Sequence, residues 1–174
     1  PLAPAPRALS PRVPTSAPSD IRAIASILND EIEAGTASWK TRPLSDEAMS
    51  DWYLGRLSEG MPVLVAAETG GPPEGFASFG PFREGGAYAP TVEHSVYVAR
   101  EARRRGVATL LMRELVQQAR GRGLSRMIGC VSGDRADSIA FHERMGFHRC
   151  GSLPSIGLKH GRRLDLVLMV LALD

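Results

Sequence analysis

The sequence predicts a single domain of mixed α/β architecture, in which helices pack on a central sheet. Three observations lead to this prediction. Runs with helical periodicity alternate with β-rich runs from residue 16 onward. A length of 174 residues suits one domain, and 43% hydrophobic residues can build a core without disulfides or metal. We take residues 9–174 as the domain and expect the proline-rich residues 1–8 to be a disordered extension.

The first half of the domain is predicted to hold an edge strand, two helices and a hairpin. Prolines within residues 9–14 restrict that run to a sheet edge. Isoleucine and leucine recur at helical spacing over residues 21–32, and a second short helix opens at Ser45. The β-rich runs 62–68 and 75–82 flank a turn rich in glycine and proline, which predicts a hairpin.

The second half alternates strands with helices. Leucines on one face predict a long amphipathic helix that Gly123 stops, and Gly146 ends a shorter one. The predicted strands are 91–99, 126–131, 147–152 and 164–173, and the predicted helices are 107–122 and 138–145.

Composition excludes several classes of protein. No apolar run approaches the roughly 18 residues of a membrane helix, and no signal-peptide pattern opens the chain, so we expect no membrane partner. The two cysteines, Cys130 and Cys150, match no metal-ligand spacing. We therefore expect no metal site, reduced thiols and a cytoplasmic protein.

The most informative segment lies between the third β-rich run and the long helix, where a strand enters a basic loop. The backbone N–H groups at a helix N-terminus bind anions, and small residues at Gly106 and Ala108 let a pyrophosphate approach. The arginines at 103, 104 and 105 add positive charge. Two alternatives are a solvated charged turn and a nucleic-acid site. A net charge of only +2 and the lack of stacking aromatics near these arginines argue against nucleic acid.

These residues resemble the GNAT superfamily of N-acetyltransferases. Arg103–Ala108 reads Arg-x-x-Gly-x-Ala, similar to the signature Gln/Arg-x-x-Gly-x-Gly/Ala at the same strand-to-helix junction. Three further segments resemble the phosphinothricin and methionine sulfoximine acetyltransferase branch: Thr91–Val98, Ser138–Phe147 and Gly157–Gly161. Together with Thr36–Trp39, they extend the likeness over about residues 9–173. The chain departs from the branch in a longer loop at 133–137 and in Arg163, where the branch often has Trp.

The resemblance implies a GNAT fold: a mostly antiparallel sheet with helices on both faces and two splayed parallel strands, 91–99 and 126–131. Acetyl-CoA, the cosubstrate, would lie between these strands. Backbone groups near Tyr97 and Val98 would hydrogen-bond the pantetheine arm and the acetyl carbonyl. By analogy the protein would be a homodimer. The implied cofactor-binding residues are Val96, Tyr97, Val98, Arg103, Arg104, Arg105, Gly106, Val107, Ala108 and Ser138.

Two residues are candidates for proton transfer. An amine must be neutral to attack a thioester, so a general base is needed, and Glu93 is our candidate, acting directly or through water. His142 stands where many GNAT proteins have Tyr and is our candidate acid for the departing thiolate, with base and structural roles left open. The alternative for Glu93 is a solvent-facing or edge position. His94 points away from Glu93 in a regular strand, so we expect it to face the core.

The predicted acceptor is an amino-acid-like amine such as phosphinothricin, methionine sulfoximine or methionine sulfone. Its carboxylate needs a cation, and Arg83 is the candidate, although an exposed loop charge is an equal alternative. Trp39 and Phe79 are candidate pocket walls, His160 is a candidate lining residue, and ordinary packing is the alternative for the two aromatics. Two other functions stay open: acetylation of a polyamine, an aminoglycoside or a protein N-terminus, and non-catalytic sensing of acyl-CoA.

Overall fold

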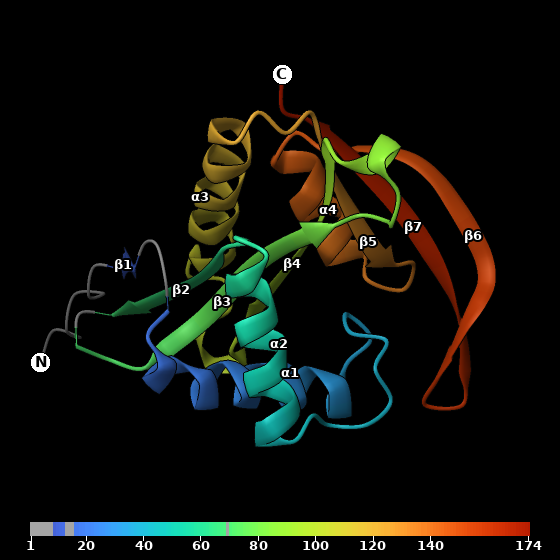
Figure 1. The fold of residues 1–174 in the computed structure, drawn as a ribbon. Coiled ribbons are helices and arrows are strands. Elements are labelled where there is room, and N and C mark those ends of the chain that lie inside the picture. Colours follow the sequence, from blue (N-terminus) through green and yellow to red (C-terminus); the bar gives the residue numbers. More distant parts are fainter. Residues whose placement is uncertain (1–8, 13–15, 69) are drawn as a thin grey trace, which may run out of the picture.

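A seven-stranded sheet organises the computed structural model, which describes residues 9–12, 16–68 and 70–174 (Figure 1). The strand order is β1-β2-β3-β4-β5-β7-β6, and every neighbouring pair is antiparallel except β4 and β5. The predicted extension 1–8 and the end of the first predicted strand lie outside the described residues. The strands are β1 Leu9–Arg12, β2 Val63–Glu68, β3 Pro73–Pro81, β4 Thr91–Val98, β5 Arg126–Ser132, β6 His148–Lys159 and β7 Arg162–Ala172.

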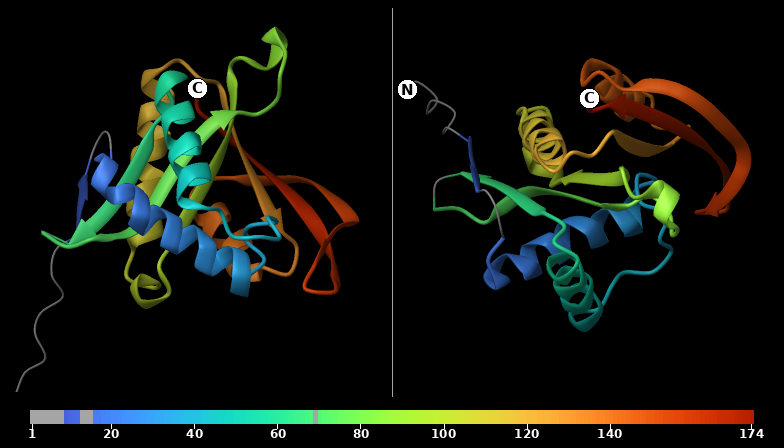
Figure 2. Two further views of the ribbon diagram at one scale, coloured as in Figure 1. Left: turned by 60° about the horizontal axis from the view of Figure 1, so that its bottom comes forward. Right: turned by 45° about the horizontal axis from the view of Figure 1, so that its top comes forward.

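Helices cover both faces of the sheet, as the sequence predicts (Figure 2). On one face α1 (Ile21–Ala34) and α2 (Asp46–Ser58) pack against β2 and β3. On the other, α3 (Val107–Gly121) packs against β2, β3 and β4, and α4 (Ala136–Arg144) packs against β5 and β6. The sheet therefore separates two hydrophobic clusters, and a residue of β4 points into one side or the other according to its position along the strand.

Local sequence accounts for these helices. The apolar stripe of α1, with Ile24, Leu28 and Ile32, is buried against the sheet. Ser45 caps α2 by accepting a hydrogen bond from the Ala48 N–H at 3.1 Å. In α3 the side chain of Leu115 is fully buried. The predicted existence, type and order of these elements are confirmed.

The largest departure from the predicted elements is β6, which runs to Lys159 rather than ending near residue 152. Its register against β7 shifts twice, between Arg149 and Gly151 and between Leu153 and Gly157. Glycine and proline at these irregularities remove the alternation by which a strand is recognised, and proline is tolerated here because β6 is an edge strand. The segment after Gly157 therefore ends a strand and turns into β7 at His160–Gly161.

The splayed pair of parallel strands is also present. β4 and β5 are in register over only three residue pairs, from Thr91 opposite Arg126 to Glu93 opposite Ile128. β4 continues to Val98 alongside β3, whereas β5 continues to Ser132 alongside β7. The two halves of the sheet consequently separate beyond Glu93, which is where the candidate site lies.

Candidate active site

The separation of β4 and β5 leaves a cavity of about 300 Å³ that extends from the start of α3 to α4. Every predicted cofactor-binding residue except Arg105 lines it, and so does His142. A smaller cavity of about 60 Å³ adjoins β4 and the end of β5. His94 and Ser95, which are neighbours on β4 and point to opposite faces of the sheet, both line the smaller cavity.

The start of α3 has the features of an anion site. Gly106 caps the helix in the left-handed region, at φ 85°, and Arg104 also has a positive φ of 64°. No side chain caps the helix, so the N–H groups of its first turn remain free to bind an anion beside the cavity. Glycine suits position 106 because other residues adopt this conformation at a cost.

The exposed edge of β4 offers backbone groups to the cavity. The Ala99 N–H bonds to the Glu74 carbonyl on β3 at 2.8 Å, and alternate residues of an antiparallel strand bond to the same neighbour. Tyr97 therefore turns its backbone toward β3, whereas Val96 and Val98 turn theirs toward the space that β5 has left. The candidate hydrogen-bonding positions are thus Val96 and Val98, although Tyr97 also lines the cavity.

The three clustered arginines have different surroundings. Arg105 points away from the cavity and forms ion pairs with Glu68 at 2.5 Å and Glu74 at 2.9 Å, so the structure does not place its side chain at the cofactor site. Arg103 lines the cavity and donates from Nε to the Val98 carbonyl at 3.3 Å. Arg104 lines it as well. Two more cations in the lining were missed from the sequence, Arg135 and Arg144.

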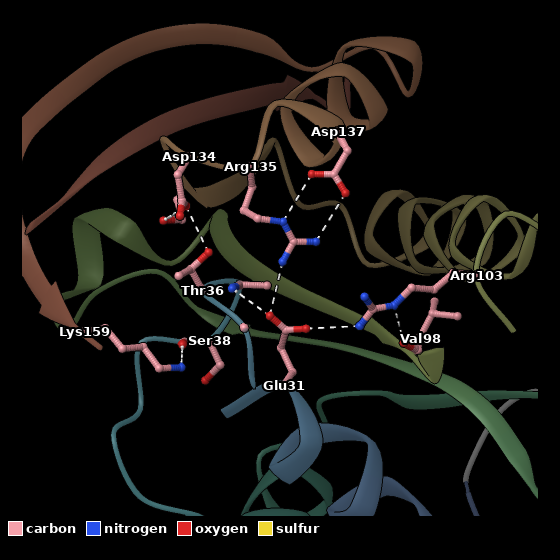
Figure 3. Close-up of polar contacts among 12 residues, drawn as sticks. Glu31, Thr36, Ser38, Val98, Arg103, Asp134, Arg135, Asp137 and Lys159 are labelled. Atoms are coloured by element: carbon pink, nitrogen blue, oxygen red, sulfur yellow. Dashed lines mark hydrogen bonds and ion pairs between the residues drawn. The ribbon is translucent and has the colours of Figure 1, made fainter. Parts of the chain in front are cut away.

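Glu31 joins the two sides of the cavity mouth (Figure 3). Its buried carboxylate accepts hydrogen bonds from Arg103 at 3.1 Å, from Arg135 at 3.2 Å and from the Ala37 N–H at 2.9 Å. Arg103 precedes α3, and Arg135 precedes α4 and also pairs with Asp137 at 3.2 Å. We call Glu31, Arg103, Arg135 and Ala37 the Glu31 cluster. It connects the α1–α2 loop to both turns that border the cavity.

His142 lies against a second histidine inside the cavity. His142 Nδ1 is 2.7 Å from the Ser138 carbonyl, and His142 Nε2 is 3.1 Å from Nε2 of His94. The pKa of His94 is lowered from 6.5 to about 3, mainly by burial and to a smaller extent by the nearby His142. Burial also lowers the pKa of His142. A side chain at Gly129 would lie 3.0 Å from both rings, so this glycine makes room for the pair. His94 is buried as expected, yet it also lines the cavity.

Glu93 lies on the opposite face of β4 from His94, at the last residue pair before the strands separate. It lines neither cavity and is half-buried beside Cys130. The pKa of the Cys130 thiol is raised to about 12. Burial is the largest cause, and the nearby Glu93 carboxylate, which accepts a hydrogen bond from the thiol, is the second. Arg83 is close enough to Cys130 to lower that pKa in part, and its guanidinium lies 5.0 Å from the centre of the Phe82 ring.

A second cation on this face was not anticipated. Gly80 is the cross-strand partner of Glu93, and a methyl group at Gly80 would lie 1.8 Å from Nη1 of Arg56. The guanidinium of Arg56 therefore covers the strand next to Glu93. Its Nε is buried and has no hydrogen-bond partner among the described residues, and its ion pair with Glu59 is long, at 3.8 Å. Arg56 is one of several charged residues of α2, and no local sequence pattern singles it out for this position.

The α1–α2 loop is held by the β6–β7 hairpin. Lys159 donates to the Ser38 carbonyl at 2.6 Å (Figure 3), and burial lowers the pKa of this lysine. His160 Nε2 lies 3.3 Å from the Gly35 carbonyl. The Trp39 ring packs on Gly157, where a methyl group would lie 2.6 Å from it. The predicted substrate residues Trp39 and His160 thus both take part in the contact between loop and hairpin, and neither lines the two cavities at the splay.

The structure does not place Phe79 in a pocket wall. Phe79 is 1% exposed and belongs to the hydrophobic cluster under α3. The Arg122 guanidinium lies 5.2 Å from the centre of its ring. Phe79 is the cross-strand partner of His94, so it faces the α3 side rather than the side of Glu93. Its neighbours Ser78 and Gly80 face the Glu93 side, and the sequence alone did not distinguish the two registers.

Two classes of feature are missing from the described part of the chain. Among residues 9–12, 16–68 and 70–174, no group of three or more His, Cys, Asp or Glu side chains is arranged to hold a metal ion. In the same residues, no helix combines the length and the apolar character needed to cross a membrane.

The residues at the splay fit acetyl-CoA. Free amides and arginines at the start of α3 match its pyrophosphate, and the open β4 edge matches the amide groups of its pantetheine arm. When bound, acetyl-CoA would supply the activated acetyl group. The chain would hold the phosphates at Arg103, Arg104 and the α3 amides, align the arm on Val96 and Val98, and exclude water from the splay.

Comparisons with known proteins agree with this assignment. Residues 24–147 match the Acetyltransferase (GNAT) family. The L-methionine sulfoximine/L-methionine sulfone acetyltransferase of Pseudomonas paraeruginosa is 38% identical over 90% of this chain and 91% of its own. The phosphinothricin N-acetyltransferase of Alcaligenes faecalis is 37% identical over 86% and 76% of the two chains.

A solved structure extends the likeness to the fold. The phosphinothricin acetyltransferase of Sinorhizobium meliloti in complex with AcCoA superimposes with a TM-score of 0.90 at 32% identity, over 94% of this chain and 88% of that one. The fold, the cavity at the splay and the sequence similarity lead to one conclusion: the chain belongs to the GNAT family of acetyl-CoA-dependent acetyltransferases.

Proposed function

We propose that the chain acetylates the α-amino group of a small amino acid whose side chain ends in a tetrahedral, oxygen-rich group, such as phosphinothricin, methionine sulfoximine or methionine sulfone. The observation that carries this proposal is the position of Glu93 at the splay: its strand partner Gly80 is covered by the Arg56 guanidinium, and its neighbour Cys130 lies within electrostatic reach of Arg83. The lining of the cofactor cavity begins at the next residue of β4, His94. A carboxylate and two guanidiniums match the ammonium and the anionic groups of such an acceptor. The named substrates of the relatives have this chemistry.

In this proposal Glu93 removes a proton from the substrate ammonium, directly or through water, so that the neutral amine can attack the acetyl carbonyl. Backbone N–H groups at Val96 or Val98 stabilise the negative charge that develops on the carbonyl oxygen. His142 is on the cofactor side, where the departing sulfur collects a proton. The splay lets the amine and the thioester approach from opposite faces of β4.

The acceptor's carboxylate is proposed to bind Arg83, and Arg56 is the matched alternative because it covers Gly80 beside Glu93. We would compare Arg83→Ala and Arg56→Ala with the wild type, using the free acid and the methyl ester of methionine sulfone. If Arg83 holds the carboxylate, Arg83→Ala raises KM for the acid far more than it lowers kcat. With the ester, which lacks the carboxylate, KM of the variant should differ little from KM of the wild type. Additive losses with Arg83→Ala would move the assignment to Arg56 or elsewhere.

The acceptor class is tested by measuring thiol release from acetyl-CoA with a panel of amines. We expect methionine sulfone, methionine sulfoximine and phosphinothricin to have the highest kcat/KM. Higher values for spermidine, an aminoglycoside or a peptide N-terminus would overturn the acceptor and leave the family unchanged. Tight acetyl-CoA binding without thiol release for any amine would favour the acyl-CoA sensor.

We also propose a homodimer. The edge strand β6 exposes three large apolar side chains, Leu153 at 44%, Ile156 at 55% and Leu158 at 66%, and a second copy would cover them. Sedimentation of the wild type and of Leu158→Lys tests this, and a monomeric wild type would refute it. The unpaired state of Cys130 and Cys150 is consistent with the proposed cytoplasmic location.

No nucleic-acid partner is proposed, because carboxylates pair with two of the three clustered arginines and the third lines the cofactor cavity. Arg103 is paired with Glu31, and Arg105 is paired with Glu68 and Glu74. These neighbouring carboxylates reduce the positive field that a phosphate backbone would need. A filter-binding measurement at low salt checks this, and retention of duplex or single-stranded DNA would contradict it.

A further inference from the structure

The gap between β4 and β5 has no strand pairing beyond three residue pairs, so side chains must hold its two halves together. Next to the last pair, His94 of β4 lies 3.1 Å from His142 of α4. Farther along, Arg103 follows β4 and Arg135 follows β5, and both donate to the carboxylate of Glu31 (Figure 3). Glu31 therefore connects the two halves of the sheet where the backbones no longer pair.

The Glu31 carboxylate is buried, with only 8% of its side chain exposed. A buried carboxylate is costly unless donors surround it. Here Oε1 accepts from Arg135 Nη1 at 3.2 Å and from the Ala37 N–H at 2.9 Å, and Oε2 accepts from Arg103 Nη2 at 3.1 Å. A methyl group at Gly35 would lie 1.8 Å from Oε1, although φ at Gly35, −118°, suits any residue. The glycine is thus explained by the space that the carboxylate takes.

Both arginines of this bridge are held in one orientation. Arg103 donates from Nε to the Val98 carbonyl at 3.3 Å and from Nη2 to Glu31, which leaves its Nη1 for a phosphate. Arg135 pairs with both carboxylate oxygens of Asp137, at 3.2 and 3.3 Å, and reaches Glu31 with Nη1. Two carboxylates balance two guanidiniums, so the bridge needs no ligand to neutralise it.

We propose that Glu31 is a positioning residue, which fixes the width of the gap that receives the pantetheine arm of acetyl-CoA. Glu31, Arg103 and Arg135 all line the cofactor cavity, which extends from the start of α3 to α4. By holding both arginines, one carboxylate sets the distance between the turn before α3 and the turn before α4. A gap that is already formed spares the cost of ordering its two sides when the cofactor binds.

A further contact supports the turn before α4. Asp134 accepts from the Thr36 hydroxyl at 2.9 Å and from Arg162 at 2.6 Å, so the α1–α2 loop and β7 both hold this turn. Glu31 and Arg135 lie outside the segments by which the sequence resembles the phosphinothricin branch. The proposal concerns the acetyl donor, so it goes beyond the proposed acceptor and applies whichever amine the protein acetylates.

The test compares acetyl-CoA with its nucleotide fragment, adenosine 3′,5′-bisphosphate, which has the phosphates and lacks the pantetheine arm. The ratio of the two Kd values, measured by calorimetry, reports what the arm contributes to binding. In Glu31→Gln the amide can accept from one arginine only, because its NH₂ group donates. We expect the ratio of fragment Kd to acetyl-CoA Kd to fall about tenfold, the loss of one charge-assisted hydrogen bond. Glu33→Gln, exposed on the same helix, is the control and should keep the wild-type ratio.

Two further variants keep the test independent of the charge change. Gly35→Ala pushes the Glu31 carboxylate aside and leaves its charge intact, so the ratio should fall here as well. Arg135→Gln cuts the same bridge from the other half of the sheet. We expect the double variant Glu31→Gln/Arg135→Gln to lose no more than the larger single loss, because one bridge is broken once.

Three results would overturn the proposal. The first is a wild-type ratio in folded Glu31→Gln and Gly35→Ala. The second is an equal weakening of both ligands, which would place the effect on the phosphates or on the whole fold. The third is additive losses in the double variant, which would give the two residues separate roles. None of these measurements includes an amine, so an error in the proposed acceptor would leave every outcome interpretable.

Discussion

The two sides of the splay are built in different ways. On the cofactor side one continuous stretch, from Val96 to Ala108, supplies a strand edge, a basic turn and a helix N-terminus, and α4 with the turn before it completes the cavity. The proposed amine side is assembled from distant segments: Glu93 on β4, Arg56 on α2, and an α1–α2 loop fixed by residues of the β6–β7 hairpin. Recognition of the common cofactor is thus mainly local, whereas recognition of the acceptor depends on the tertiary fold.

The comparison predicts its largest effect at Glu93. Glu93→Gln should fold normally, bind acetyl-CoA like the wild type and lose about 10²- to 10⁴-fold in turnover at neutral pH, because a proton-transfer group is lost. Part of the rate should return at alkaline pH, where more of the amine is already neutral. Steady-state kinetics with methionine sulfone measures this, with the exposed Glu101→Gln as control. Wild-type turnover with every accepted amine would place the base elsewhere.

A change on the cofactor side should affect only the cofactor. Acetyl-CoA at 100 times its Kd should stabilise the wild type by about 2.7 kcal/mol, which raises its melting temperature. Gly106→Asp should abolish this rise by placing a carboxylate beside the pyrophosphate. Gly123→Asp is the matched control, because Gly123 has a similar positive φ of 70° and open space at the other end of α3. An undiminished shift in Gly106→Asp would refute the phosphate site.

The buried histidine pair should make stability depend on pH. His94 has a pKa of about 3 in the folded protein and 6.5 when unperturbed, so the unfolded chain binds more protons between these values. Stability therefore falls as pH drops through this window, by about 2 kcal/mol for one such group between pH 7 and pH 5. Urea unfolding of the wild type and His94→Gln measures the difference. Equal pH dependence in both would show that His94 is not the group responsible.

The smallest expected effect lies at the hairpin contact. Lys159→Met keeps the apolar stem and removes the hydrogen bond to the Ser38 carbonyl, at a cost of about 1 kcal/mol in unfolding free energy. KM for the amine should rise and acetyl-CoA binding should stay unchanged, because Ser38 belongs to the α1–α2 loop. Lys40→Met, at an exposed lysine of the same loop, is the control. A larger change in acetyl-CoA binding than in amine KM would contradict the separation of the two sides.

This difference between the sides also explains what the sequence predicts. Helical and β periodicity give the order of elements, and a contiguous motif locates the turn before α3. The departures arise where long-range contacts decide: Arg105 is drawn away by Glu68 and Glu74, and Phe79 differs from Ser78 and Gly80 only by strand register. No local pattern shows that His94 meets His142, since 48 residues separate them.

The Glu31 cluster has a consequence for how the chain folds. Glu31 is separated by 72 residues from Arg103 and by 104 from Arg135, so its carboxylate finds these partners only after most of the chain is available. Contacts of such long range are costly to form early, because the intervening chain must first be ordered. During synthesis, α1 emerges long before the arginines that neutralise its buried charge. We therefore expect α1 to dock late, and a ribosome-bound fragment that lacks residue 135 to leave this helix unprotected from hydrogen exchange.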